Sequence, residues 1–341
     1  MTDTRVPVLV DDPTSGTLLA ASLQAYAEAA AAFARASRAP ATEAAYNKDF
    51  RHFEAWCSAH NLVALPTTPS ILALFLSAHA DTFSVATLQR RVAAIMVAHR
   101  RAGIESASLR HDPRFADVWA GIRRTKGTAS KGKAPLITDD VRRLVAHLPD
   151  TLAGKRDRSI ILVGFAAALR RSEIVGLDVA DLSLSSQGLQ LHIRKSKRDQ
   201  EGQGMIKAIP YGQNPETCPV RATKDWLLAS RFRDGPVYRA IDRFGRIGQD
   251  RLSAQVVRLI VRAAIVRAAQ AEGCTRQEAE RQAGAYAAHS LRSGWVTSAA
   301  AAGIPDLAVM AHTGHRHRDT AQKYLEIGRL WADHPAGRVG L

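Results

Sequence analysis

Apolar residues recur every three or four positions through most of the chain, which is the spacing of one face of an α-helix. This pattern predicts an Ala-rich helix over residues 15–36 and four helices within residues 39–127. Cap and turn residues mark the ends of these four helices: Thr42, Thr68, Pro69, Ser84 and Gly103. The first part of the chain is therefore expected to be helical throughout.

A stretch with a different period interrupts the helices in the second part. Leu189, Leu191 and Ile193 alternate with polar residues and predict a strand, which residues 205–211 join across a polar loop to make a hairpin. Helical spacing resumes in four segments: residues 219–229, 251–271, 288–301 and 304–313. The expected fold is mainly α, with one small antiparallel sheet.

A Gly-, Ser- and Lys-rich stretch at residues 127–133 has no apolar anchor and predicts a flexible basic linker. It separates a helical domain, residues 39–127, from a second domain, residues 128–341. Residues 1–38 form an N-terminal tail and the Ala-rich helix, which docks either on its own domain or on a neighbouring protomer.

The net charge of the chain indicates the kind of partner that it binds. The 341 residues include 47 Lys and Arg against 32 Asp and Glu, a net charge of +15. Such an excess indicates a polyanionic partner, and nucleic acid is favoured over an anionic membrane because the basic residues are spread over helices and loops.

Cysteine usage and hydropathy indicate the compartment. The three cysteines are far apart in the sequence and suggest neither a disulfide framework nor a metal site. The sequence has no signal-peptide pattern and no apolar run of the roughly 20 residues that span a bilayer. We therefore expect a cytoplasmic protein without membrane contact, associated with the nucleoid when it is bound to DNA.

Five features of the second domain carry candidate chemistry. They are Arg170 with Glu173, Lys197 in the hairpin, His289 with Arg292, His315, and Tyr324. Taken singly, each has an ordinary alternative: a surface ion pair, a solvated turn lysine, a polar helix face or a core aromatic residue. Their occurrence in one order within one domain of a basic protein favours a joint site.

The segments Ala168-Leu169-Arg170-Arg171-Ser172-Glu173, His289-Ser290-Leu291-Arg292 and Gly314-His315 to Tyr324 resemble the catalytic motifs of the tyrosine recombinases, the phage integrase family. The resemblance extends over residues 39–341 as an architecture, and it implies a C-shaped clamp around duplex DNA. It is similar to the simple two-domain type of Cre and Xer enzymes, because the N-terminal region is too short for an additional arm-binding domain.

The resemblance implies a role for each residue. Arg170 and Arg292 hold the phosphate oxygens, with His315 as a further donor, and Glu173 supports the site. Tyr324 attacks the phosphorus to give a 3′-phosphotyrosyl intermediate, His289 accepts its proton, and the hairpin lysine protonates the leaving 5′ oxygen. Lys197 matches that lysine best, with Lys195 and Lys207 as nearby alternatives.

The resemblance implies a reaction that uses neither ATP nor a metal ion, so no cofactor is expected. One metallic alternative uses His312, His315 and His317 as zinc ligands. Asp319 follows this cluster. The alternative is disfavoured because Arg316 lies between His315 and His317 and Arg318 directly follows His317, and their charge opposes a bound cation. It would make the protein a zinc-dependent nuclease.

DNA contacts are expected from basic and polar residues on predicted helix faces and in the linker, with phosphate contact favoured over base contact. These residues are Lys48, Arg51, Thr87, Arg90, Arg91, Arg100, Arg101, Arg123, Arg124, Lys126, Lys131, Lys133, Gln255 and Arg258. A solvated helix face is the alternative for each. Gln255 suits adenine better than guanine, so a target site read by an arginine near that place in relatives such as Cre is not carried over to this chain.

The partners expected are double-stranded DNA with inverted-repeat target sites and further copies of the chain, in a tetramer on synapsed DNA. Two alternatives to site-specific recombination remain: the same chemistry in a type IB topoisomerase or telomere-resolving enzyme, and a non-catalytic DNA-binding regulator. The sequence specifies neither the target DNA nor the choice between integration, excision and resolution.

Overall fold

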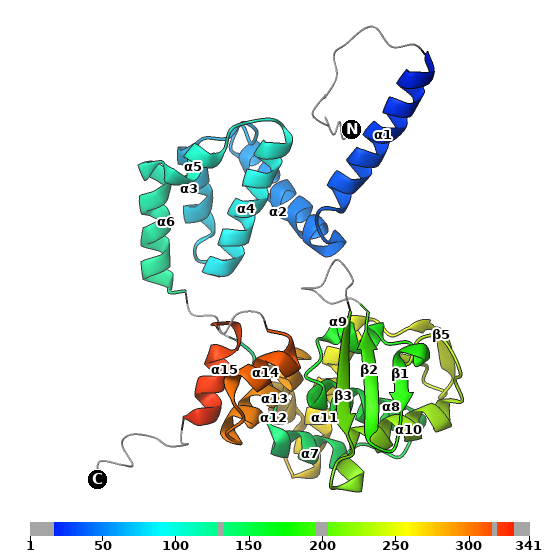
Figure 1. Ribbon diagram of the computed structural model, residues 1–341. Coiled ribbons are helices and arrows are strands. Elements are labelled where there is room, and N and C mark those ends of the chain that lie inside the picture. Colours follow the sequence, from blue (N-terminus) through cyan, green and yellow to red (C-terminus); the bar gives the residue numbers. More distant parts are fainter. Residues whose placement is uncertain (1–16, 129–131, 195–203, 316–318, 331–341) are drawn as a thin grey trace. The chain divides into compact units, whose positions relative to one another are not determined.

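The computed structural model describes residues 17–128, 132–194, 204–315 and 319–330 (Figure 1). The chain divides into two compact units, residues 1–131 and 132–341. Helices dominate both units, and small antiparallel sheets occur in the second. This confirms the expected fold class, while the C-shaped clamp stays a prediction. Within those four ranges, every helix is too short or too polar to cross a membrane.

The first unit contains six helices in its described part. They are α1 (Thr17–Ala36), α2 (Pro40–Ala59), α3 (Pro69–His79), α4 (Val85–Arg101), α5 (Ala107–His111) and α6 (Pro113–Lys126). The hydroxyls of Thr68 and Ser84 accept the backbone N–H groups of Ile71 and Thr87, each at 3.3 Å, as their predicted caps require. The prediction of a cap at Thr42 is wrong, because the helix already begins at Pro40.

The helix α5 is a correction to the four helices expected in residues 39–127. It has five residues, too few for a helical period to be seen in the sequence. The core of this unit lies between α2, α3, α4 and α6 and contains Phe53, Phe75, Leu88 and Ile95, all fully buried. These are positions that the helical spacing places inside.

The helix α1 leaves its large apolar side chains in solvent. Tyr26 is 69% exposed and Phe33 76% exposed. Such exposure is unusual for a row of aromatic residues at helical spacing. Docking of α1 on a neighbouring protomer stays a prediction.

The second unit contains nine α-helices and five strands in its described part. The helices are α7 (Thr138–Ala146), α8 (Leu152–Ala166), α9 (Arg171–Gly176), α10 (Pro219–Ser230), α11 (Ala254–Ala271), α12 (Arg276–Gly284), α13 (His289–Ala301), α14 (Asp306–Thr313) and α15 (Asp319–Arg329). The strands are β1 (Leu182–Leu184), β2 (Gly188–Ile193), β3 (Met205–Pro210), β4 (Arg239–Ile241) and β5 (Ile247–Arg251).

The predicted hairpin is present and gains a third strand. The sheet has the order β1-β2-β3, all antiparallel, and Ile193, the last residue of β2, pairs with Met205, the first residue of β3. A second sheet, β4-β5, corrects the expectation of one sheet only. Arg251, predicted in a helix, ends β5, and α11 begins at Ala254 after Ser253.

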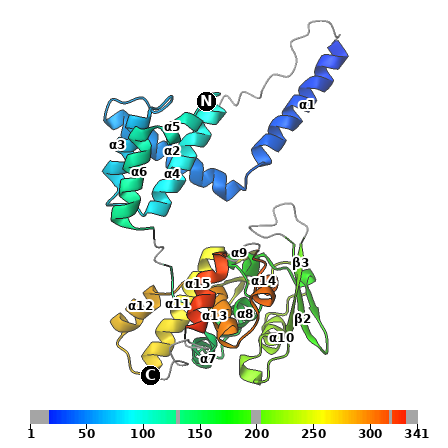
Figure 2. The same cartoon turned by 60° about the vertical axis from the view of Figure 1, so that its left-hand side comes forward.

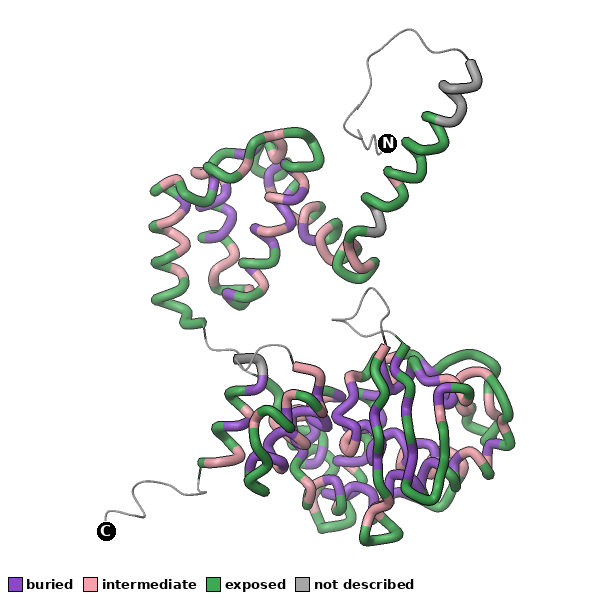
Figure 3. Tube along the Cα trace, in the orientation of Figure 1, coloured by how far each residue is buried: buried purple, intermediate pink, exposed green. Residues whose placement is uncertain are grey.

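The three-stranded sheet lies along one flank of the helical body (Figures 1 and 2). Its inward residues Leu189, Leu191 and Ile209 join the main core, which also contains the fully buried Trp226 (Figure 3). A smaller core of Val296, Ala299, Ala300, Val309, Ala321 and Leu325 joins α13, α14 and α15. The helix that carries Tyr324 is therefore held by small apolar residues.

Glycine permits the close approach of α15 to α13. A Cβ atom on Gly328 would lie 2.3 Å from the Thr297 carbonyl oxygen and 2.7 Å from the Ala300 methyl. Gly328 is one helical turn after Tyr324, so the contact fixes the position of the tyrosine.

We expect Gly328→Ala to destabilise the protein by about 1–3 kcal/mol, because the methyl group forces α15 away from α13. Gly121→Ala in α6 is the matched control: its Cβ meets nothing within 4 Å. That control should stabilise the protein by up to about 1 kcal/mol through helix propensity. Denaturant unfolding measures both, and equal stabilisation by the two substitutions would contradict this packing.

Candidate active site

Arg170 lies in a tight turn between α8 and α9. Ala168 has φ of 49°, a left-handed conformation that is unfavourable for alanine, and it reverses the chain just before the arginine. Arg170 then caps α9: its backbone N–H donates to Glu173 Oε2 at 2.8 Å and its Nη1 to Oε1 at 2.5 Å. Glu173 is buried while the Arg170 side chain is 18% exposed, so the carboxylate aims a guanidinium that still reaches solvent.

Arg292 lies one turn into α13 and is almost fully buried, at 1% exposure. Its Nη1 donates to the Ala168 carbonyl at 2.7 Å and its Nη2 to the Thr313 carbonyl at 2.5 Å. One guanidinium thereby joins the turn before Arg170 to the end of α14. The two predicted phosphate-binding arginines lie in one region of the fold.

His315 is tied to Arg292 and to the end of α14. The Thr313 hydroxyl donates to the Val309 carbonyl at 2.8 Å and lies 2.7 Å from His315 Nδ1. Arg292 Nη2 lies 3.1 Å from His315 Nε2. Because guanidinium can only donate, Nε2 accepts and Nδ1 carries the proton that is given to Thr313.

His289 and Tyr324 face each other across α13 and α15. Their ring centroids are 6.3 Å apart with the planes at 61°. The His289 pKa is lowered by desolvation and by the positive charges of Arg292 and Arg170, so the imidazole is neutral near pH 7. A neutral imidazole beside a phenol can accept its proton.

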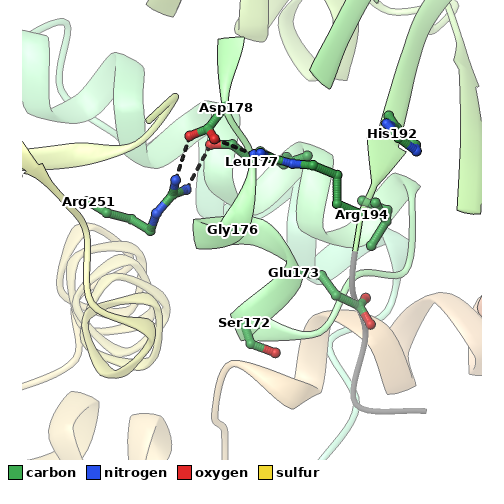
Figure 4. A pocket seen from close by; sticks show the side chains of 9 residues that line it. Ser172, Glu173, Gly176, Leu177, Asp178, His192, Arg194 and Arg251 are labelled. Atoms are coloured by element: carbon green, nitrogen blue, oxygen red, sulfur yellow. Dashed lines mark hydrogen bonds and ion pairs between the residues drawn. The ribbon is translucent and has the colours of Figure 1, made fainter. Parts of the chain in front are cut away.

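The predicted general acid, Lys197, and the alternative Lys195 lie outside the described residues. The strand that leads to them is anchored by Asp178, which accepts hydrogen bonds from Arg194 and, at 2.5 Å, from Arg251. Burial alone would raise the pKa of Asp178, but these two bonds outweigh it and lower the pKa. Asp178, Arg194 and Arg251 line an open cavity of about 450 Å³ whose wall includes Glu173 (Figure 4).

Lys207, the second alternative for the general acid, is buried on β3, and its ammonium donates to two backbone carbonyls. The zinc alternative is disfavoured by the contacts of two of its ligands. Both ring nitrogens of His315 are engaged, and His312 Nε2 lies 2.9 Å from the Ala166 carbonyl. His317 lies outside the described residues, among which no group of three metal-ligating side chains occurs.

Most of the residues predicted to bind DNA are exposed on helices. Those with exposed side chains in the described residues are Lys48, Arg51, Arg90, Arg100, Arg101, Arg123, Arg124, Lys126, Lys133, Gln255 and Arg258. Thr87 is half-buried and shares a 3.0 Å hydrogen bond with Ser84, and Lys131 lies outside the described residues.

Several of these cations already have protein partners. Arg90 makes a two-pronged ion pair with Asp49, and Arg101 makes another with Glu43. Arg91 is only 8% exposed, with its guanidinium 3.8 Å from the Phe83 ring centroid. This burial disfavours DNA contact by Arg91, whose position one residue from Arg90 turns it towards the core.

The family of the chain follows from its similarity to known proteins. Residues 135–328, more than half of the chain, match the model of the phage integrase family. The chain belongs to the phage integrase family of tyrosine recombinases. It is therefore an enzyme of site-specific DNA recombination, which breaks and rejoins DNA strands, and the resemblance seen in the three motifs is confirmed.

Known relatives agree. An integrase/recombinase XerD homolog of Selenomonas ruminantium is 35% identical over 309 residues, covering 89% of this chain and 86% of the relative. The tyrosine recombinase XerD of Lacticaseibacillus casei is 30% identical over 152 residues, 44% of this chain and 49% of its own.

Solved structures share the fold at low sequence identity. The lambda integrase dimer bound to a COC′ core site has a TM-score of 0.56 at 14% identity, covering 94% of this chain and 84% of that one. The XerH recombinase bound to palindromic difH substrate has a TM-score of 0.55 at 14% identity, covering 80% and 71%.

We expect the cleavage rate to fall at acidic pH as His289 becomes protonated. Because its pKa lies below the ordinary value of 6.5, the rate should be constant near pH 7 and fall at lower pH. His289→Gln should cleave more slowly and lack this acidic limb. Single-turnover rates between pH 5 and pH 8 measure it, and an unchanged acidic limb in the variant would assign the titration to another group.

Proposed function

We propose that this recombinase cuts DNA with Tyr324 as its nucleophile, assisted by Arg170, His289, Arg292 and His315, with Lys197 as the general acid. The phenol oxygen bonds to the phosphorus, the 5′ oxygen leaves with a proton from the lysine, and the phenol proton passes to His289. A 3′-phosphotyrosyl ester remains. A 5′ hydroxyl of another strand attacks this ester and reverses the step, so no external energy source is required.

One observation carries the proposal: residues far apart in the sequence meet in one unit. The Arg292 guanidinium contacts the turn that precedes Arg170 and lies 3.1 Å from His315, while His289 on the same helix faces Tyr324. Two guanidiniums at one place suit the non-bridging oxygens of a phosphate, on which negative charge develops during attack.

A non-catalytic regulator has no need of this combination. A DNA-binding protein uses cations on its surface, whereas here one arginine is buried and a second is aimed by a buried glutamate. A topoisomerase-like use of the same chemistry remains an alternative, but no contact in the described residues favours it.

The proposed partners are duplex DNA with inverted-repeat sites and three further copies of the chain, in a tetramer that pairs two sites. The relatives of known structure include one bound to a palindromic substrate, which supports inverted repeats as the target. The proposed location is the cytoplasm, on the nucleoid while DNA is bound.

Tyr324→Phe should abolish the covalent protein–DNA adduct while leaving DNA binding intact, because only the phenolic oxygen is removed. A nicked suicide substrate that carries the target site accumulates the adduct, and denaturing electrophoresis detects it. Peptide mapping of the wild-type adduct should identify Tyr324, and the released DNA end should carry a 5′ hydroxyl. Adduct formation by Tyr324→Phe would remove the tyrosine from the nucleophile's role.

DNA affinity should fall steeply with salt, because each neutralised phosphate releases counterions. A protein with 6–10 phosphate contacts loses about 10³–10⁵ in affinity between 50 and 200 mM salt. Arg123→Gln should reduce the slope of log K against log [salt] by about 0.9. Arg276→Gln, an exposed residue paired with Glu280 and outside the predicted set, is the control. A nearly flat salt dependence would argue against an extensive phosphate interface.

A further inference from the structure

Lys207 is a charged residue at a position that the sheet reserves for the core. Along β3, Lys207 and Ile209 point inward while their neighbours are exposed, and Lys207 is only 6% exposed. A buried ammonium is unfavourable unless strong acceptors replace its water. The protein supplies such acceptors. Lys207 is therefore expected to have a structural or functional role at this buried position.

The acceptors are the carbonyl oxygens of Ala167 and His312, each 2.6 Å from Lys207 Nζ. Arg292 makes the same connection one residue further along both segments, from the Ala168 carbonyl to the Thr313 carbonyl. His312 adds a third, through its Nε2 to the Ala166 carbonyl.

Lys207, Arg292 and His312 thus make three hydrogen-bonded connections, called ties below, between the end of α8 and the end of α14. Three consecutive carbonyls at the end of α8, those of residues 166, 167 and 168, each bind one tie. Helix C-terminal ends carry partial negative charge, and this offsets part of the cost of burying two cations there.

The two segments that these hydrogen bonds connect both continue directly to residues of the candidate active site. The α8 turn continues within two residues to Arg170, and the end of α14 continues within two residues to His315. The strand β3, which carries Lys207, begins at Met205, eight residues after Lys197 in the sequence. Lys207 thus connects strand β3 to the two stretches of chain that carry Arg170 and His315.

We propose that Lys207 is a positioning residue, which holds Arg170 and Arg292 in the geometry that binds the phosphate oxygens and holds His315 beside Arg292. It acts through the two carbonyls and touches no DNA. This inference rests on the proposed function. It also excludes Lys207 as the general acid, because its ammonium is turned into the protein and held there.

The charge of Lys207 is consistent with this role. Burial, then the nearby Arg292, lowers its pKa to about 8, with Arg170 acting in the same direction and Glu173 opposing them. Lys207 and Arg292 in turn lower the pKa of His312, after the effect of burial. At neutral pH the ammonium is largely protonated, while His312 is neutral and able to donate its Nε2–H.

The test compares cleavage of three DNA substrates by wild type and Lys207→Met. Misplaced guanidiniums should slow cleavage of ordinary DNA by about tenfold to hundredfold, with DNA affinity unchanged. A methylphosphonate at the scissile position is neutral and has little need of the two arginines, so the variant should approach the wild-type rate on it. A 5′-bridging phosphorothiolate releases a thiolate and needs no acid. On this substrate Lys207→Met should still cleave more slowly than wild type.

Two further variants keep the test decisive. His312→Phe preserves the stacking on Trp295, where the rings lie 4.1 Å apart, and removes the tie to Ala166. It should show the same substrate pattern, so the inference does not depend on the stability of Lys207→Met. Lys224→Met, on the exposed face of α10, is the matched control and should cleave all three substrates like wild type.

Each other outcome has a distinct meaning. Rescue of Lys207→Met by the phosphorothiolate would make Lys207 the proton donor and overturn the inference. An equal defect on all three substrates would show that Lys207 has a purely structural role. The absence of any defect would show that Lys207 does not position the arginines. Either result would overturn the inference. Failure of the wild type to form a tyrosine adduct would overturn the proposed function itself, and the inference with it.

Discussion

The site depends on a single buried guanidinium, that of Arg292, which joins two helix ends. With 1% exposure it has lost its water, and the Ala168 and Thr313 carbonyls replace that water at 2.7 and 2.5 Å. Both carbonyls lie at or just after a helix C-terminus, where the backbone is electron-rich. The buried Arg292 is thus stable only when α8 and α14 end beside it. In turn, its hydrogen bonds hold the two helix ends together.

This arrangement also sets the orientation of the neighbouring groups. His315 takes one tautomer because Arg292 can only donate to it, and Thr313 accepts from its other nitrogen. Arg170 is aimed by Glu173 through both its backbone and its side chain. Preorganised donors of this kind are what a phosphoryl-transfer site needs, since reorganisation during the reaction would cost rate.

The sequence predicts the parts of this site whose chemistry is distinctive. These parts are Arg170, His289, Arg292, His315 and Tyr324. Charged and aromatic residues in this order within one domain are hard to explain as surface or core residues. Strand β2 and the caps at Thr68 and Ser84 were predictable because their signals are local. The match of residues 135–328 to the phage integrase family confirms the family of the chain. The roles of the individual residues stay predictions.

Other features depend on tertiary contacts that no local pattern reveals. Lys207 has the appearance of a solvated strand residue until the ends of α8 and α14 are placed beside it. Arg91 has the same character as Arg90 in the sequence, yet a rotation of one residue buries it against Phe83 and His52. The one-turn α5 and the polar strand β5 carry too little periodicity to be seen.

The most direct test of the account is a crystal structure of the protein trapped on a suicide DNA substrate. The account predicts a bond from Tyr324 Oη to phosphorus, with guanidinium nitrogens of both Arg170 and Arg292 about 3 Å from the non-bridging oxygens. A phosphorus atom bonded to another residue, or held with either guanidinium turned away from its oxygens, would contradict the account.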